Sequence, residues 1–273
     1  MPELPEVETT LRGVAPYITQ QTIAKVVVRQ YQLRWPILPN IQQILTGKTI
    51  VDSGRRGKYL LLKTSQGAII IHLGMSGNLR ILTKAVAANK HDHVDIVFHN
   101  KAILRFTDPR RFGAFLWAEG DPCDHALLKN LGVEPLTRQF SGQYLASLAR
   151  GKIVSIKSFI MDSKIVTGVG NIYAAEALFA AGIHPQSPAG SISINHLEKL
   201  VKAIKKILQH AIKRGGTSLK DFLNSEGKPG YFSNQLKVYG REGLPCVGCG
   251  QLLQLMRIGQ RSTVYCGDCQ PLP

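Results

Sequence analysis

The first six residues of the chain, MPELPE, combine residue types that could carry out covalent chemistry. If the initiator Met1 is removed, Pro2 becomes a free secondary amine with the Glu3 carboxylate beside it. An α-amino group has a pKa of about 7.7–8.0, so a useful fraction is unprotonated at neutral pH. Such an amine can attack an aldehyde-level carbon and form a charged iminium, which is Schiff-base catalysis. The alternative is that Pro2 and Pro5 only stiffen a chain end.

A second group of residues has the spacing of a metal site. Two Cys-x2-Cys pairs are separated by 16 residues, and they comprise Cys246, Cys249, Cys266 and Cys269. Four thiolates at this spacing suit one tetrahedral zinc ion, whereas disulfides suit a cytosolic chain poorly. A four-cysteine site leaves no position open for water, so the predicted zinc is structural. The fifth cysteine, Cys123, has no matching partner in the sequence.

The residues between the cysteine pairs predict a β-hairpin, with strands over 252–257 and 262–265 and a turn at 258–260. This hairpin would hold Arg257 and Arg261 beside its turn. An exposed arginine on a metal-stabilised hairpin is suited to contact a phosphate or a groove.

Four further clusters are weaker signals when each is taken alone. The Gly-Val-Gly-Asn run at 168–171 could bind a phosphate at a helix start, and Asn171 could cap that helix; the two roles are compatible. The turn over 107–113 could insert a wedge into a base stack, or it could be a packed turn. The basic run at 55–59 could be a solvated strand edge. His91 and His93 flank Asp92, but neighbours on a strand point to opposite faces, which disfavours a metal site.

Composition indicates the kind of partner. The 273 residues carry a formal net charge of +16, shared evenly between residues 1–150 and 151–273. This charge favours a polyanionic partner, either nucleic acid or an anionic membrane surface. No apolar run is long enough to cross a membrane, and the acidic, proline-rich start does not resemble a signal peptide. We therefore expect a cytoplasmic protein.

The elements that must position these residues change character along the chain. A helix is predicted from Pro5 to about Pro16, and short apolar runs then predict strands at 23–28, 49–51, 59–62, 68–73, 94–98, 103–106 and 114–117. Helical periods follow at 126–131, 144–148, 172–181 and 197–212. Asn195 and Glu198 form a plausible capping pair for the last helix, whose lysine-rich face we expect to be solvated. Residues 216–235 are predicted to form a long loop.

The pattern predicts an α+β protein of two domains. The first is an N-terminal β domain with flanking helices over residues 1–131, either a β-sandwich or a barrel, followed by a linker region over 132–150. A helical domain covers 151–237, and the zinc-finger hairpin covers 238–272.

Taken together, these segments resemble bacterial formamidopyrimidine-DNA glycosylase over essentially the whole chain. The resemblance rests on residues 1–9, 56–60, 72–77, 90–93, 108–113, 168–173, 227–231 and 235–240, together with the four cysteines. It implies a helix-two-turn-helix DNA-binding domain and a monomeric enzyme with one structural zinc. The implied activity is excision of oxidised purines from duplex DNA, followed by β,δ-elimination at the abasic site.

The resemblance also implies roles for individual residues. In this family pattern Pro2 would be the nucleophile, Glu3 would transfer protons and Glu6 would be a supporting carboxylate. Lys58 would assist the first elimination and Arg261 the second. The residues implied to contact DNA or to fill the void left by an extruded base are His91, Arg110, Lys152, Asn171, Met75 and Phe112. The segment around 217–231 is similar to the lesion-sensing loop of the family.

Two alternatives remain. The sister family, endonuclease VIII, acts on oxidised pyrimidines, but it typically has glycine where this chain has Leu4, and it lacks the full set of void-filling residues. A non-catalytic zinc-ribbon DNA-binding protein would suit the charge and the cysteines. That alternative gives no reason for Pro2, Glu3 or Lys58.

Overall fold

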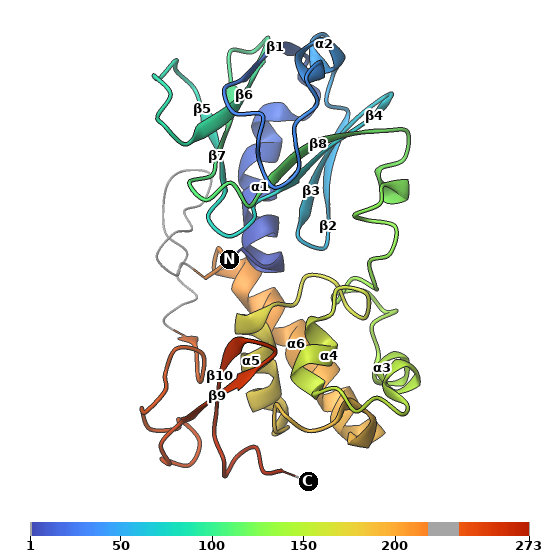
Figure 1. Cartoon of the computed structure of the whole chain (residues 1–273), viewed down its shortest axis with the longest axis vertical. Coiled ribbons are helices and arrows are strands. Elements are labelled where there is room, and N and C mark those ends of the chain that lie inside the picture. Colours follow the sequence, from blue (N-terminus) through green and yellow to red (C-terminus); the bar gives the residue numbers. More distant parts are fainter. Residues whose placement is uncertain (1, 218–234, 273) are drawn as a thin grey trace. The chain divides into compact units, whose positions relative to one another are not determined.

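The computed structural model describes residues 2–217 and 235–272, which form two compact units (Figure 1). The N-terminal unit contains residues 2–129 and 214–217, and the C-terminal unit contains 130–213 and 235–272. The predicted α+β organisation in two domains is confirmed. The predicted linker, residues 132–150, lies within the C-terminal unit and contains a helix. The boundaries at 150–151 and 237–238 stay predictions.

The N-terminal unit is a sandwich of two four-stranded antiparallel sheets. One sheet has the order β1-β6-β7-β5 and the other β2-β3-β4-β8. The strands are β1 (Ile23–Val28), β2 (Asp52–Arg56), β3 (Tyr59–Thr64), β4 (Gly67–His72), β5 (Asn78–Leu82), β6 (Asp92–Phe98), β7 (Ile103–Thr107) and β8 (Ala114–Glu119). The short helix α2 (Ile41–Leu45) and the 3-10 turn η1 (Pro122–Asp124) also belong to this unit.

Side-chain alternation explains the sandwich. Leu60 and Leu62 of β3 and Ile69 and Ile71 of β4 belong to one apolar core, into which the β6–β7 sheet also contributes. Successive strand residues point to opposite faces, so these alternate positions meet between the sheets. Packing in this core fixes the positions of β4 and β7, and the loops that follow these two strands lead into the candidate site.

Helix α1 (Leu4–Ile18) also packs on this core, through Val7, Leu11, Val14 and Ile18. Pro5 lies in its first turn, where a missing N–H costs nothing. The helix continues two residues beyond Pro16. Its buried face therefore fixes the start of the chain against the sandwich.

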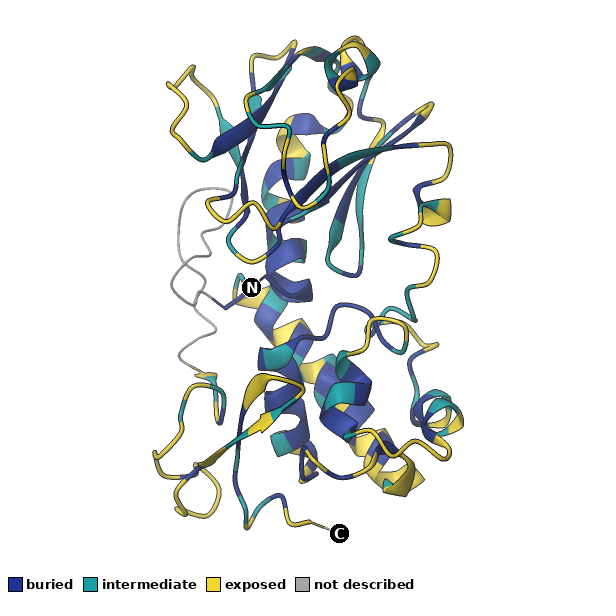
Figure 2. Cartoon of the chain, viewed as in Figure 1, coloured by how far each residue is buried: buried dark blue, intermediate teal, exposed yellow. Residues whose placement is uncertain are grey.

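The C-terminal unit contains the helices α3 (Gly142–Ala149), α4 (Ile156–Met161), α5 (Asn171–Ala181) and α6 (Ile194–Lys213), with the 3-10 turn η2 (Ala189–Ser191). Figure 2 shows α5 mostly buried, whereas buried and exposed residues alternate along α6. Strands β9 (Gln254–Ile258) and β10 (Arg261–Tyr265) form the predicted hairpin. Within the described residues, no helix is both long enough and apolar enough to cross a membrane.

Several local predictions were wrong. Residues 126–130 form turns rather than a helix, and the strand expected at 49–51 begins at Asp52. Ser193, not Asn195, precedes α6, and its Oγ accepts the His196 N–H at 3.4 Å. Gly170, not Asn171, is the N-cap of α5. Elements α2, α4 and β5 were not predicted.

Candidate functional site

The start of the chain lies at the buried end of α1. Pro2 is buried, and the Glu3 side chain is buried beside it. Glu3 and Glu6 form a reciprocal capping box in which each carboxylate accepts the backbone N–H of the other residue. The Glu6 Oε2 atom lies 2.8 Å from the Glu3 nitrogen. This box fixes the backbone that carries Pro2.

Glu6 has a second partner far along the sequence. Its Oε1 atom accepts the Thr217 N–H at 2.7 Å, and both residues are buried. The Cβ of any residue replacing Gly216 would lie 3.1 Å from the same oxygen. Glu6 thus binds two backbone N–H groups and holds the entry to the predicted lesion-sensing loop against the first turn of α1. Residues 218–231 of that loop lie outside the described residues.

Lys58 lies on the turn between β2 and β3, and α1 is bonded to this turn. Glu8 accepts from Arg55 Nε at 3.0 Å, and Arg55 Nη1 donates to the Gly57 carbonyl at 2.9 Å. Burial raises the pKa of Glu8, but the bonded guanidinium groups of Arg12 and Arg55 outweigh it and hold the pKa below its usual value. A charged Glu8 therefore fastens the Lys58 turn to the helix that begins beside Pro2.

His72, at the end of β4, is a further candidate site residue that the sequence alone did not indicate. Its ring lies 4.8 Å from that of Tyr59, its partner across β3 and β4. Burial, then the charges of Lys58 and Arg34, lower its pKa to about 4. Its Nδ1 atom accepts the Gly74 N–H at 3.0 Å, so Nε2 carries the proton. His72 is thus a neutral hydrogen-bond donor close to Lys58.

Two of the predicted void-filling residues, Met75 and Phe112, line one cavity, and the third, Arg110, stacks on Phe112. Met75 and Phe112 are 38% and 43% exposed, and both line a cavity of about 520 Å³ together with His72. The Arg110 guanidinium carbon lies 4.8 Å from the centre of the Phe112 ring. The structure thus brings together Met75, Arg110 and Phe112, which come from two separate loops.

Asp108 joins these two loops. It is fully buried, and its carboxylate accepts from Ser76 Oγ at 2.9 Å and from the Gly113 N–H at 2.7 Å. Gly74 has a φ of +61°, and a Cβ there would lie 2.5 Å from the Phe112 backbone. Only glycine allows the Met75 loop to approach the Phe112 loop so closely.

His91 precedes β6 in the same unit. The carboxylate of the next residue, Asp92, accepts the Asn89 N–H at 2.8 Å, while Arg105 donates to the carbonyls of Val86 and Ala87. These bonds hold the loop before His91 on the sheet. His93 points inward, where its Nε2 lies 2.7 Å from the Asp108 carbonyl oxygen.

In the C-terminal unit, two helices bond to the hairpin residue that follows Arg261. The Ser262 carbonyl accepts from Asn171 Nδ2 at 3.1 Å and from Lys157 Nζ at 3.2 Å. Lys157 is buried, and it also donates to Thr263 Oγ1 at 2.7 Å. The Oδ1 atom of Asn171 is buried and has no hydrogen-bond partner among the described residues. Helices α4 and α5 therefore fix the strand that carries Arg261, and Lys152 lies exposed between α3 and α4.

The four cysteines gather as predicted. Their Sγ atoms all lie within 4.8 Å of one another, with 3.9 Å between Cys246 and Cys269 and 3.4 Å between Cys249 and Cys266. A tetrahedral zinc with Zn–S bonds of about 2.3 Å requires sulfur atoms about 3.8 Å apart. The cluster therefore fits one zinc ion with four protein ligands, which makes the site structural.

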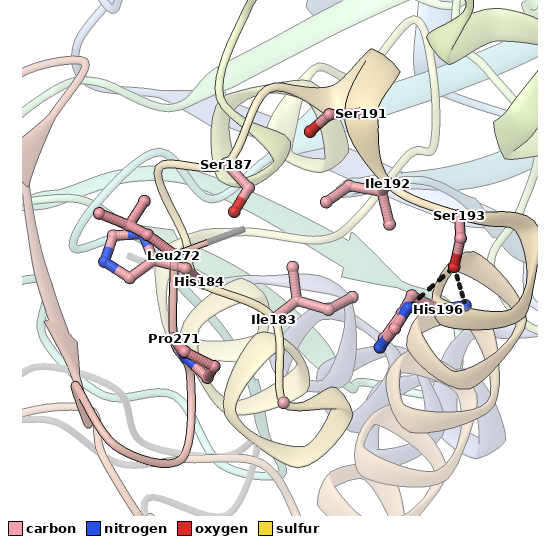
Figure 3. A pocket seen from close by; sticks show the side chains of 10 residues that line it. Ile183, His184, Ser187, Ser191, Ile192, Ser193, His196, Pro271 and Leu272 are labelled. Carbon is pink, nitrogen blue, oxygen red and sulfur yellow. Dashed lines mark hydrogen bonds between the residues drawn. The ribbon is translucent and has the colours of Figure 1, made fainter.

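Glu176 fastens this zinc hairpin to α5. Its buried carboxylate accepts the backbone N–H groups of Lys237, Val238 and Tyr239, at 2.9 Å for each of the last two. A separate cavity of about 370 Å³ lies beyond the end of α5, between Ile183, Ile192 and Leu272 (Figure 3). None of the predicted site residues lines it.

A β-sandwich unit with a buried N-terminal proline, a helical unit and a four-cysteine hairpin together define a class of zinc-finger DNA glycosylases. Three family models match in the same order as these parts. They are the formamidopyrimidine-DNA glycosylase N-terminal domain over residues 1–115, its H2TH domain over 131–223, and a zinc finger found in FPG and IleRS over 243–272.

Individual relatives agree with the family models. Formamidopyrimidine-DNA glycosylase from Shewanella sp. (strain W3-18-1) is 56% identical over 270 residues, which covers 99% of each chain. The crystal structure of MutM (Fpg) from Thermus thermophilus has a TM-score of 0.89 and 34% identity, covering 100% of both chains. A mutant Lactococcus lactis Fpg bound to Fapy-dG-containing DNA has a TM-score of 0.91 and 33% identity, covering 99% of this chain and 100% of that one.

This chain therefore belongs to the formamidopyrimidine-DNA glycosylase family. It is a DNA glycosylase of base excision repair with a zinc-finger hairpin.

Proposed function

We propose that this chain removes oxidised purines, including formamidopyrimidines, from duplex DNA through a covalent bond to Pro2 and then cuts the strand. The observation that carries the proposal is the pair of hydrogen bonds that the Glu6 carboxylate accepts, one from the Glu3 N–H and one from the Thr217 N–H. It positions the Pro2 amine and the start of the predicted lesion-sensing loop together. The Lactococcus lactis protein bound to Fapy-dG DNA supports the choice of lesion.

The chemistry begins once Met1 has been removed. A damaged base must leave the stack before an enzyme can reach its sugar. The Pro2 nitrogen attacks C1′, the bond from C1′ to the base breaks, and the base leaves. Glu3 protonates the deoxyribose ring oxygen, so that the ring opens and a Pro2–C1′ iminium forms. The buried position of Glu3 beside Pro2 supports this role.

The iminium then acts as an electron sink for two eliminations. It acidifies the C2′ hydrogen, and loss of that proton breaks the C3′–O bond. Lys58, held near α1 through Arg55 and Glu8, assists this first elimination. Loss of a second proton, from C4′, breaks the C5′–O bond, and Arg261 assists that step. Water then hydrolyses the Pro2–C1′ bond and regenerates the amine.

Recognition of the duplex uses the remaining candidate residues. Met75, Arg110 and Phe112 fill the void left by the extruded base, which the shared cavity and the Arg110–Phe112 stack support. His91, Lys152 and Asn171 contact DNA phosphates, and the neutral donor His72 does the same. The enzyme acts as a monomer on cytoplasmic, nucleoid-associated DNA.

Borohydride trapping tests this function directly. The protein should form a reducible crosslink with duplexes that contain 8-oxoguanine, and do so faster than with duplexes that contain thymine glycol. A preference for thymine glycol would assign the chain to the endonuclease VIII activity instead. Trapping on neither duplex would favour a non-catalytic DNA-binding protein.

A further inference from the structure

The exposed face of α6 carries a row of lysines that the proposed reaction does not use. The helix buries Leu197, Leu200, Val201, Ile204, Leu208 and Ala211. Its exposed lysines are Lys199, Lys202, Lys206 and Lys213, called here the lysine row. At 3.6 residues per turn the lysine row occupies a sector of only about 60°, centred about 180° from the buried face. It is therefore one straight line of positive charge along the helix.

The lysine row is not neutralised within the described residues. No carboxylate there forms an ion pair with any of its four members, and Glu198 is the acidic residue that α6 itself provides. Lysines three or four residues apart on one face, such as Lys199, Lys202 and Lys206, repel one another and destabilise a helix. A polyanion along the row would relieve this repulsion. Lys205 lies off the row, since its Nζ donates to the Thr137 carbonyl at 2.8 Å.

The geometry of the row matches a nucleic-acid backbone. From Lys199 to Lys213 the helix rises about 21 Å. One strand of a DNA duplex presents a phosphate about every 3.4 Å of its axis, so the row spans about six phosphates. Lysine binds phosphate as a point charge on a flexible stem, so it can follow a backbone without a fixed geometry.

The lysine row faces away from the DNA contacts of the proposed reaction. Helices α5 and α3 pack on α6, and they cover its buried face. Asn171 begins α5 and is bonded to the hairpin of Arg261, while Lys152 lies three residues after the end of α3. These residues therefore belong to elements on the side of α6 opposite the lysine row. One straight duplex cannot lie along both sides of a helix about 10 Å thick.

We propose that the lysine row binds a second segment of duplex DNA, so that the enzyme passes directly between DNA segments during its search. The proposal rests on the proposed function for the location of the first DNA contacts. It replaces our expectation that this face is merely solvated. The bound segment is recognised by its phosphates alone, without regard to sequence or damage.

Competitor-driven dissociation from lesion-free DNA tests the proposal. An enzyme with two DNA surfaces leaves a labelled duplex faster as unlabelled lesion-free duplex is added, since the second segment binds before the first is released. We expect this several-fold rise for the natural chain. We expect it to disappear when all four lysines of the row are replaced by glutamine, which preserves helix propensity. The salt slope of equilibrium binding should also become shallower by up to about 3.6.

Two matched variants keep the test specific. Replacing Lys25, Lys84, Lys101 and Lys129, which are exposed in the N-terminal unit, by glutamine removes the same charge and should leave the competitor effect intact. Replacing the four lysines of the row by arginine should preserve the effect as well. Thermal unfolding followed by circular dichroism identifies any variant that fails to fold.

Three outcomes would overturn the proposal. The first is a competitor effect that survives in the glutamine variant, and the second is equal loss of the effect in the control variant. The third is natural protein that responds to anionic lipid vesicles but not to competitor duplex, which would assign the lysine row to a membrane surface. Excision of 8-oxoguanine from a short duplex should remain unchanged in the glutamine variant. Failure of that excision in the natural chain would count against the proposed function alone.

Discussion

The Glu6→Gln substitution tests how the structure positions the N-terminal amine. Both Glu6 carboxylate oxygens accept backbone N–H groups, from Glu3 at 2.8 Å and from Thr217 at 2.7 Å. Glutamine keeps one acceptor but turns an NH2 group toward the other N–H. One charge-assisted hydrogen bond, worth about 1.5–3 kcal/mol, is lost, and a buried donor is left unsatisfied at a cost of about 1–3 kcal/mol. Together these two effects should lower the unfolding free energy by about 2.5–6 kcal/mol.

Urea unfolding followed by tryptophan fluorescence measures this decrease in unfolding free energy for the N-terminal unit. Both tryptophans of the chain, Trp35 and Trp117, lie in the N-terminal unit together with Glu6. The rate of borohydride trapping should fall about tenfold to a hundredfold. Restoring the geometry of the amine adds to the activation free energy, and each additional 1.4 kcal/mol slows the reaction about tenfold. Glu119→Gln, the same change at an exposed strand end, should alter neither quantity. Natural stability and natural trapping in Glu6→Gln would refute this account of Glu6.

Three further predictions concern other parts of the molecule. Arg261→Ala should leave β-elimination intact but reduce the δ-elimination product at least tenfold, with one zinc per chain still bound by atomic absorption; loss of zinc would show that the substitution disrupted the hairpin. Removal of zinc with a chelator should abolish DNA binding while the N-terminal tryptophans report a folded unit, because the ion holds the hairpin and not the sandwich. His72, whose pKa is lowered to about 4, should remain neutral in the folded state at pH 5.5 by NMR, and its contribution to stability should be lost as pH falls from about 6.5 toward 4; an imidazole that titrates near pH 6.5 would contradict this.

The local chemistry of the site could be predicted from the sequence where residues adjoin or have fixed spacing. Pro2 beside Glu3, the four cysteines and the hairpin between them all have short-range signatures, and the structure gathers the four cysteines as expected. The strands 23–28 and 59–62 were found because apolar residues mark them. Strand β2, with the sequence DSGRR, was placed too early, at 49–51, because it has almost no apolar residues and the apolar Ile50 and Val51 precede it.

The remaining contacts depend on tertiary structure. No local pattern relates Glu6 to Thr217, which are 211 residues apart, or Lys157 to Ser262, which are 105 apart. His72 could not be predicted as a site residue because its lowered pKa arises from burial and from the charge of Lys58 on the neighbouring turn. Capping of a helix by Asn171 was one of two interpretations of the sequence, but Gly170 is the N-cap of α5 and the Asn171 amide bonds to the hairpin.

The central claim is that the Pro2 nitrogen forms the covalent bond to DNA. Mass spectrometry of the borohydride-trapped complex on an 8-oxoguanine duplex, after proteolysis, identifies the crosslinked residue. We predict a sugar adduct on the N-terminal peptide at Pro2, with Met1 absent, and no adduct in protein that retains Met1. An adduct on Lys58, or full trapping by protein that retains Met1, would contradict the account.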